Sequence, residues 1–259
     1  MVGHDGPCMG ATFSATGAYL ASYGADGRIV VWDPDDWTRH TVVSSHKAAV
    51  LGLGWQTDAV FASCSADRQV LLHRLGNKKP VRVFQGHSAP VTVLRWDDSR
   101  SLLATGSDDS SVRVWSPKEG LVAWLTGHSE EISDVSWSPV GYDGRPADKT
   151  DSPSIATCSF DGSVRLWDAK SGRCSARVAA HSSMACSVAF SPSGAVVASG
   201  GSDGDVVLSS LADGRIAARV SLGVPVHSVL WDGRRDDTAW AALADGTLAC
   251  VDLRAGKMM

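Results

Sequence analysis

The stretch GHSAPVTVLRWDDSRSLLATGSDDSSVRVWS, residues 86–116, contains the features that decide the fold. After Asp109, the third and fifth residues, Val112 and Val114, are apolar, and this period of two is typical of a strand with one buried face. Glycine- and aspartate-rich turns separate such runs, and no helical period of useful length appears in the sequence. The stretch therefore predicts short strands joined by tight turns.

The same pattern recurs along the chain. An aromatic residue returns in steps of 42, 41, 41, 53 and 41 residues, at Phe13, Trp55, Trp96, Trp137, Phe190 and Trp231. An aspartate returns in steps of 41, 42, 52, 42 and 42 residues, at Asp26, Asp67, Asp109, Asp161, Asp203 and Asp245. Because the two markers agree, we expect six repeats in an all-β chain. The one long step predicts a loop insertion at residues 141–153.

Composition excludes several classes of function. The 259 residues include 24 Lys and Arg against 28 Asp and Glu, and the net charge of −4 disfavours direct binding to nucleic acid. An apolar run such as Ala239–Ala244 is far shorter than the roughly 18 residues that a membrane helix needs, so no membrane partner is expected. The six cysteines form no CxxC pair, which favours free thiols in a reducing compartment. We therefore predict no metal site and no cofactor.

Three repeats begin with Gly-His and end with Trp followed by Asp or Ser. They run from Gly3-His4 to Trp32-Asp33, from Gly86-His87 to Trp115-Ser116, and from Gly127-His128 to Trp167-Asp168. These repeats resemble WD repeats, which form the four-stranded blades of a β-propeller. The resemblance implies one propeller domain over residues 3–259, with repeats at about 3–33, 45–74, 86–116, 127–168, 180–210 and 222–252.

Four stretches carry a closer resemblance, to the transducin β-like corepressor subunits. They are Phe61–Asp67, Phe84–His87, Ala156–Asp161 and Asp245–Arg254. This resemblance implies a non-catalytic scaffold for transcriptional corepression in the nucleus, which bridges histone tails, a nuclear receptor corepressor and a histone deacetylase. The alternative is a substrate receptor or signalling scaffold of a ubiquitin ligase or another, cytoplasmic assembly.

That family has a LisH dimerisation segment and further repeats upstream of the matching ones. We therefore expect the six repeats to form an incomplete, open ring whose last blade lacks its outer strand, because only Lys257, Met258 and Met259 follow the turn at Ala255-Gly256. An open ring exposes two apolar blade faces, which drive association.

Three repeats hold His, Ser or Thr, Asp and Trp at fixed offsets. These are His4, Ser22, Asp26 and Trp32; His87, Thr105, Asp109 and Trp115; and His128, Thr157, Asp161 and Trp167. A propeller hydrolase would need one exposed nucleophile beside one oxyanion hole, whereas this set recurs once per repeat. We therefore interpret the set as a structural hydrogen-bond network and predict no catalytic residue. Repeats two, five and six lack parts of the set, so we expect softer blades there.

Two further groups of residues are open to interpretation. The six recurring aromatic residues could form a stacking platform for single-stranded nucleic acid, but their fixed place favours packing between blades. The loops after the repeat histidine and between the second and third strands vary between repeats, so we expect them to bind protein. The candidate binding residues are Lys47, Asp108, Glu130, Glu131 and Phe160.

Overall fold

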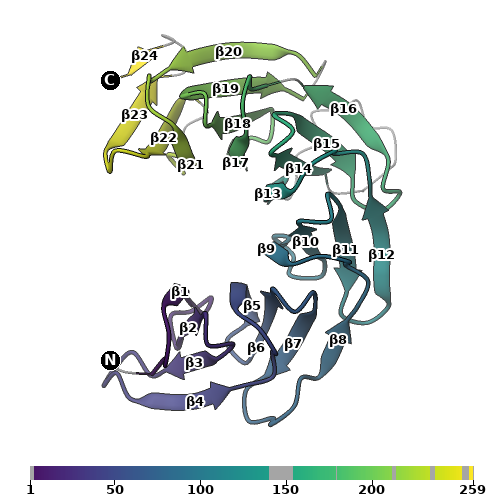
Figure 1. Cartoon of the computed structure of the whole chain (residues 1–259), viewed down its shortest axis with the longest axis vertical. Helices are drawn as coiled ribbons and strands as arrows, with labels where there is room; N and C mark the ends of the chain where they lie inside the picture. The colour runs from purple at the N-terminus through teal and green to yellow at the C-terminus, as the bar shows by residue number, and fades with distance from the viewer. Residues whose placement is uncertain are drawn as a thin grey trace. The chain divides into compact units, whose positions relative to one another are not determined.

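The computed structural model describes residues 3–139, 154–178, 180–211, 214–233, 237–252 and 257–258. These residues form β-strands and turns, and none of them belongs to an α-helix. The strands make six four-stranded sheets, and in each sheet the neighbouring strands are consecutive in the sequence (Figure 1). The expected all-β fold with four-stranded blades is confirmed. The expected insertion at residues 141–153 lies outside the described residues.

The first three sheets cover the first half of the chain. Sheet one contains β1 (Cys8–Phe13), β2 (Leu20–Gly24), β3 (Ile29–Trp32) and β4 (Arg39–Val43). Sheet two contains β5 (Val50–Thr57), β6 (Val60–Ser65), β7 (Val70–Arg74) and β8 (Arg82–Phe84). Sheet three contains β9 (Val91–Trp96), β10 (Leu103–Ser107), β11 (Val112–Ser116) and β12 (Gly120–Leu125).

The other three sheets follow the same plan. Sheet four contains β13 (Ile132–Trp137), β14 (Ser154–Ser159), β15 (Val164–Asp168) and β16 (Cys174–Val178). Sheet five contains β17 (Ala185–Phe190), β18 (Val196–Gly201), β19 (Asp205–Ser210) and β20 (Ile216–Ser221). Sheet six contains β21 (Val226–Trp231), β22 (Thr238–Leu243), β23 (Leu248–Asp252) and β24 (Lys257–Met258).

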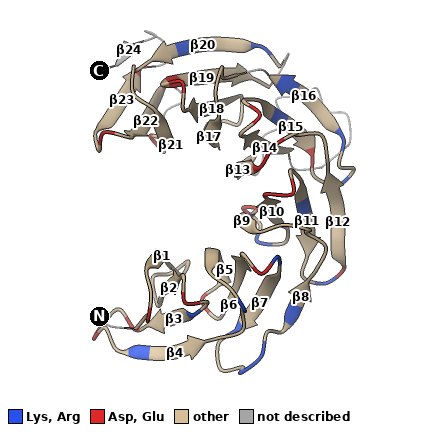
Figure 2. Cartoon of the chain, viewed as in Figure 1, with Lys and Arg blue, Asp and Glu red and all other residues tan. Residues whose placement is uncertain are grey.

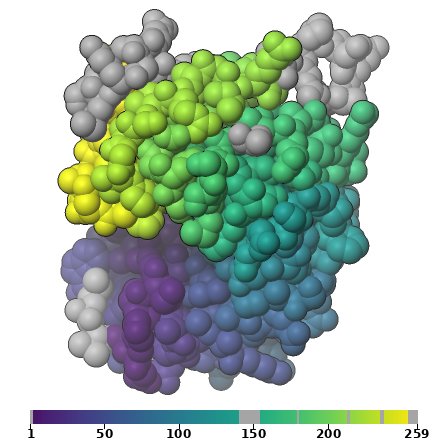
Figure 3. Space-filling model, turned by 45° about the horizontal axis from the view of Figure 1, so that its top comes forward, coloured from purple at the N-terminus to yellow at the C-terminus, as the bar shows by residue number. Residues whose placement is uncertain are grey.

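The chain divides into two compact units. The first consists of residues 1–109 and 113–122, and the second of residues 110–112 and 123–259. Within each unit the middle strands are buried on both faces, as in β3 and β6, where every residue is buried. The outer strands are more exposed, and β20, in yellow-green, lies at the surface of the second unit (Figure 3). Strands buried on both faces explain the runs of valine, isoleucine and leucine in the sequence.

Recurring tryptophans connect neighbouring sheets within each unit. The indole Nε1–H of Trp55 donates to the Thr12 carbonyl at 3.1 Å, and that of Trp96 donates to the Gly54 carbonyl at 2.9 Å. In the second unit, Trp231 donates to the Ala189 carbonyl at 3.0 Å. Each carbonyl belongs to the first strand of the preceding sheet. At these positions the expected packing between blades is confirmed.

Two expectations are wrong. Phe13 is 54% exposed. Its ring is therefore not packed between two sheets of the described residues. The sixth sheet does have a fourth strand, because Lys257–Met258 pairs with β23 through Asp252↔Lys257 and Val251↔Met258. Two residues are enough to continue the ladder there. The open ring stays a prediction.

Candidate functional site

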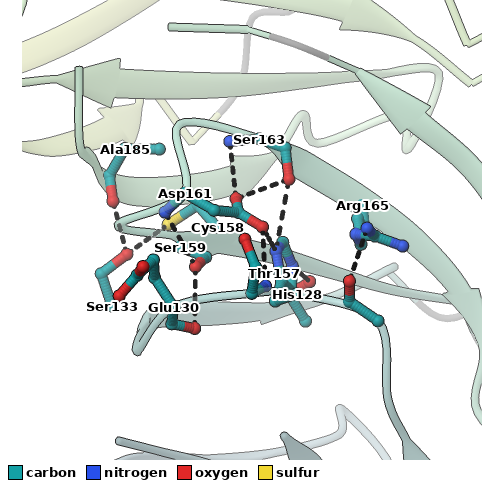
Figure 4. A network of polar contacts seen from close by, with 12 residues as sticks. His128, Glu130, Ser133, Thr157, Cys158, Ser159, Asp161, Ser163, Arg165 and Ala185 are labelled. Atoms are coloured by element: carbon teal, nitrogen blue, oxygen red, sulfur yellow. Dashed lines mark hydrogen bonds and ion pairs between the residues drawn. The ribbon is translucent and has the colours of Figure 1, made fainter. Parts of the chain in front are cut away.

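In sheet four, the repeated polar residues form one hydrogen-bonded chain, and Figure 4 shows its members His128, Thr157 and Asp161. The Trp167 indole N–H donates to the Thr157 hydroxyl at 2.9 Å, and this hydroxyl lies 2.8 Å from His128 Nε2. His128 Nδ1 lies 3.0 Å from a carboxylate oxygen of Asp161. Since a carboxylate can only accept, Nδ1–H donates to Asp161, and the lowered pKa of the buried ring indicates that Nε2 carries no proton and accepts from the Thr157 hydroxyl. His128 is therefore neutral.

The surroundings of this hydrogen-bonded chain explain the protonation states of His128 and Asp161. Burial lowers the pKa of His128, and the opposing effect of Asp161 does not reverse the shift. For Asp161, burial acts to raise the pKa, but hydrogen bonds from Ser163 and His128 outweigh it and lower the pKa well below its usual range. Thr157 is fully buried, so a substrate could not reach its hydroxyl. The arrangement holds a turn in place and presents no accessible nucleophile.

The glycine before His128 is required by a close contact. The guanidinium of Arg165 donates to the Gly127 carbonyl at 2.7 Å and lies over the Trp167 ring, 5.9 Å from its centroid. Gly127 has a φ of +152°, and a Cβ there would lie 2.6 Å from the Arg165 guanidinium. A side chain at Gly127 would displace the arginine that covers the tryptophan.

The same chain of contacts recurs in repeats one and three. The indole of Trp32 donates to Ser22 at 2.9 Å, and the indole of Trp115 donates to Thr105 at 2.9 Å. The histidine–hydroxyl distances are 2.8 Å for His4 and 2.9 Å for His87. The shortest histidine–carboxylate distances are 3.1 Å to Asp26 and 2.9 Å to Asp109. That these networks stabilise the blades stays a prediction.

Repeat two has a histidine, His73, at the position of the tryptophan, and this residue completes the network. His73 Nε2 lies 3.0 Å from the Ser63 hydroxyl, which in turn lies 2.8 Å from His46 Nε2. Ser63 precedes His73 by ten residues, as Ser22 precedes Trp32, so His73 takes the place of the indole. Burial and the nearby His46 lower the pKa of His73 to about 3, so it donates as a neutral ring. The shared spacing could have revealed this role.

Repeats five and six are less complete. In repeat five, His181 lies 2.9 Å from both Ser199 and Asp203, but no residue replaces the indole. The hydroxyl of Ser209, which occupies that position, is buried and has no partner among the described residues. In repeat six, Asp245 accepts hydrogen bonds from the Thr247 N–H at 2.9 Å and hydroxyl at 2.7 Å in an exposed turn.

Three of the five predicted binding residues lie together. The Phe160 N–H donates to the Glu131 carbonyl at 3.0 Å, and the Ser159 hydroxyl donates to the Glu130 carbonyl at 3.0 Å. The segment that leads into β13 thus carries its two acidic residues beside the turn after β14 (Figure 2). Glu130 is exposed and Phe160 is 43% exposed. We refer to Glu130, Glu131 and Phe160 as the acidic–aromatic patch.

The other two predicted residues occupy equivalent loops in the first unit. Lys47 is exposed and its backbone N–H donates to Asp67 at 2.9 Å. Asp108 is half-buried, and its N–H donates to the Pro90 carbonyl at 3.0 Å. Lys47 and Asp108 belong to the first unit and the acidic–aromatic patch to the second, and their shared role stays a prediction.

Two other kinds of site are absent from the described residues. No group of three or more His, Cys, Asp or Glu side chains there is arranged to hold a metal ion. That part of the chain also has no helix with the length and apolarity needed to cross a membrane.

Comparison with known families decides the relationship. The family model described as "WD domain, G-beta repeat" matches residues 1–33, 78–116, 120–168 and 172–208. The chain belongs to the WD-repeat family. The segments that the model leaves unmatched include all of repeat two and all of repeat six, in which His73-Arg74 and Val251-Asp252 stand in place of Trp-Asp.

Individual relatives agree with this assignment. The mouse F-box-like/WD repeat-containing protein TBL1X is 36% identical over 251 residues, which are 97% of this chain and 47% of TBL1X. The WD40 repeat-containing protein HOS15 of Arabidopsis thaliana is 32% identical over 59% of this chain and 25% of HOS15. The protein transport protein sec13 of Emericella nidulans is 26% identical over 80% of this chain and 77% of sec13. The resemblance to the transducin β-like corepressor subunits is confirmed, and the chain spans about half the length of TBL1X.

Proposed function

We propose that this chain is a non-catalytic protein-interaction module of a transcriptional corepressor complex in the nucleus. In this role it connects histone tails to a corepressor that carries a histone deacetylase. The similarity to TBL1X over 97% of the chain supports the proposal, as does membership of the WD-repeat family. The repeated polar residues are buried within the blades, so specificity must come from loop residues that do not repeat.

The observation that carries the proposal is the acidic–aromatic patch. Its backbone hydrogen bond holds the loop before β13 against the turn after β14, so the patch is preorganised. Two carboxylates can pair with lysine ammonium groups of a basic tail. The exposed Phe160 ring can pack against the aliphatic part of a lysine and attract its charge. A basic, unfolded peptide is the partner that this chemistry fits.

Titration of labelled histone-tail peptides tests the proposal. The variants Glu130→Arg and Glu131→Arg reverse charge, while their backbone carbonyls keep accepting from Ser159 and Phe160. We expect each variant to weaken binding about tenfold, since a charge pair at an interface contributes about 1.5 kcal/mol or more. Asp232→Arg is the matched control, because Asp232 is an exposed acidic residue in the turn after β21. Unchanged binding of every histone peptide by both patch variants would overturn the proposal.

A further inference from the structure

The first unit contains a pocket at the ends of its first strands that the proposed histone-tail surface does not use. The pocket has a volume of about 360 Å³ and lies where β1, β5 and β9 end. The His–Asp networks of this unit lie at the other end of the same strands, since His4, His46 and His87 precede them. The volume is within the range of pockets that bind ligands.

The lining of this pocket combines aromatic and cationic side chains. Phe13, which is 54% exposed, supplies apolar surface, and Arg95 and Arg100 supply positive charge. Trp55, Trp96 and Leu94 also line the pocket, but they are almost fully buried. None of the residues that line the pocket, all of them described, is acidic. Both indole N–H groups already donate to carbonyls of neighbouring strands, so the tryptophans offer a ligand no donor. A ligand must therefore present a negative group beside an apolar group.

Arg100 is fixed in place by its neighbours and retains donors for a ligand. Its guanidinium donates to the Trp55 carbonyl at 2.8 Å, and Gln56 Nε2 donates to the Arg100 carbonyl at 2.8 Å. The Trp55 carbonyl is the only partner that the Arg100 side chain has among the described residues. A guanidinium has five N–H donors in a planar fork that matches a carboxylate, so most of its donors remain for a ligand.

Two acidic residues at this end of the strands, Asp58 and Asp97, do not pair with Arg100. Asp58 accepts the Thr16 N–H at 3.1 Å. Asp97 accepts the N–H groups of Ser101 and Leu102, both at 2.8 Å. Asp97 is thus held by its own turn and Asp58 by the turn between β1 and β2, and neither pairs with Arg100.

We propose that this pocket binds an acidic peptide segment in which a glutamate or aspartate lies next to an aliphatic residue. The carboxylate pairs with Arg100, with Arg95 adding positive charge, and the aliphatic side chain packs on the exposed Phe13 ring. A single-stranded nucleic acid is disfavoured because the chain carries a net charge of −4 and the faces of Trp55 and Trp96 are too buried to stack on bases. The module would then have a site for an acidic segment besides its proposed site for a basic one.

Fluorescence anisotropy with a blocked, labelled peptide of alternating leucine and glutamate tests this proposal on the full chain. We expect saturable binding that Arg100→Gln weakens about tenfold, through loss of a charge-assisted hydrogen bond. Arg68→Gln is the matched control, because Arg68 is also an exposed arginine with positive φ, at +70° against +57° for Arg100. The control should bind like the wild type.

A second variant guards against effects on folding. Ala15 is an exposed residue of the pocket lining, so Ala15→Glu adds a repelling carboxylate without disturbing the core. It should also weaken binding, whereas Glu131→Arg should not change it. The proposal is overturned if the acidic peptide does not bind, if binding survives both pocket variants, or if a lysine-for-glutamate peptide or an oligothymidylate binds more tightly.

Discussion

At the scale of single residues, the hydroxyl of Thr157 shows why the repeated network is stable. Its oxygen accepts from Trp167 at 2.9 Å while its proton is donated to His128 at 2.8 Å. The hydroxyl is fully buried, and a buried polar atom without a partner costs about 1–3 kcal/mol. Each residue of this hydrogen-bonded chain therefore needs its neighbour as a partner for its buried polar atom.

The variant His128→Ala should destabilise the domain by about 1–3 kcal/mol, because Thr157 and Asp161 would keep their polar atoms and lose their shared partner. Unfolding in denaturant, followed by tryptophan fluorescence, measures the loss. Asp245→Ala is the control, since Asp245 contacts only its own exposed turn and should leave the midpoint nearly unchanged. A wild-type midpoint for His128→Ala would show that the network does not stabilise the blade.

Residue patterns predicted the complete networks but not the variant one. His4, His87 and His128 each have a hydroxyl, an aspartate and a tryptophan at fixed offsets, and such offsets survive because strand register fixes them. His73 differs in residue type from the tryptophan of the other repeats, so a comparison of residue types predicts a missing member. Its ring N–H offers the same donor in the same place, which only the geometry made clear.

At the scale of elements, the spacing of the repeated residues predicted the number of sheets but not where the first and last sheets end. Turn residues and alternation locate strands, whereas the length of an edge strand depends on pairing that no periodic pattern records. β24 is only two residues long, too short for any period, and Phe13 fits the aromatic pattern although its ring is not packed between two sheets of the described residues. The Arg100 pocket was also missed, because it gathers residues from three separate strands and their turns.

The sixth sheet presents an apolar face. Leu230 and Trp240 are cross-strand partners, as are Ala242 and Leu248, so all four side chains point to one side of the sheet. Leu230 and Leu248 are each 65% exposed, and Trp240 is 39% exposed. Exposed apolar patches of this kind favour association with another surface.

We therefore expect the chain to self-associate at protein concentrations of roughly tens of micromolar. The variant Leu230→Lys/Leu248→Lys should reduce association, because two ammonium groups cannot be buried unpaired in an interface. Val42→Lys is the control, since Val42 is an exposed valine of the outer strand β4. Sedimentation velocity distinguishes the cases, and a wild-type chain that stays monomeric over this range would contradict the prediction.

At the scale of the whole molecule, the buried histidines make stability depend on pH. Burial lowers the pKa of His46, His128 and His181 below the ordinary value of 6.5. The unfolded chain therefore binds more protons than the folded chain below about pH 6.5, and stability falls with pH from there. Asp67, Asp161 and Asp203 have lowered pKa values because hydrogen bonds outweigh burial, so their contribution is lost only below about pH 4.

The expected stability curve has two acid steps. The free energy of unfolding should be nearly constant between pH 7 and 8, decline from about pH 6.5, and decline more steeply below about pH 4. Denaturant midpoints across this range measure the curve, and His128→Gln should flatten the first decline because one titrating group is gone. A midpoint that does not change between pH 7.5 and 5 would contradict the assigned neutral histidines.

The identity of the partner was the least predictable property of the whole molecule. The repeats determine a scaffold, because the same residues must recur to build each blade, but a binding surface consists of the residues that do not recur. Glu130, Glu131 and Phe160 could be selected as variable positions from the sequence. That Phe160 and Glu131 are joined by a backbone hydrogen bond emerged only from the structure.

Capture from nuclear extract tests the proposed corepressor role most directly. The wild-type chain, immobilised, should retain histone deacetylase activity, measured on an acetylated histone peptide. Glu130→Arg/Glu131→Arg should keep the deacetylase but lose the histone-tail peptide, and Asp232→Arg should keep both. An immobilised wild-type chain that retains no deacetylase activity, while folded by its unfolding midpoint, would contradict the proposed function.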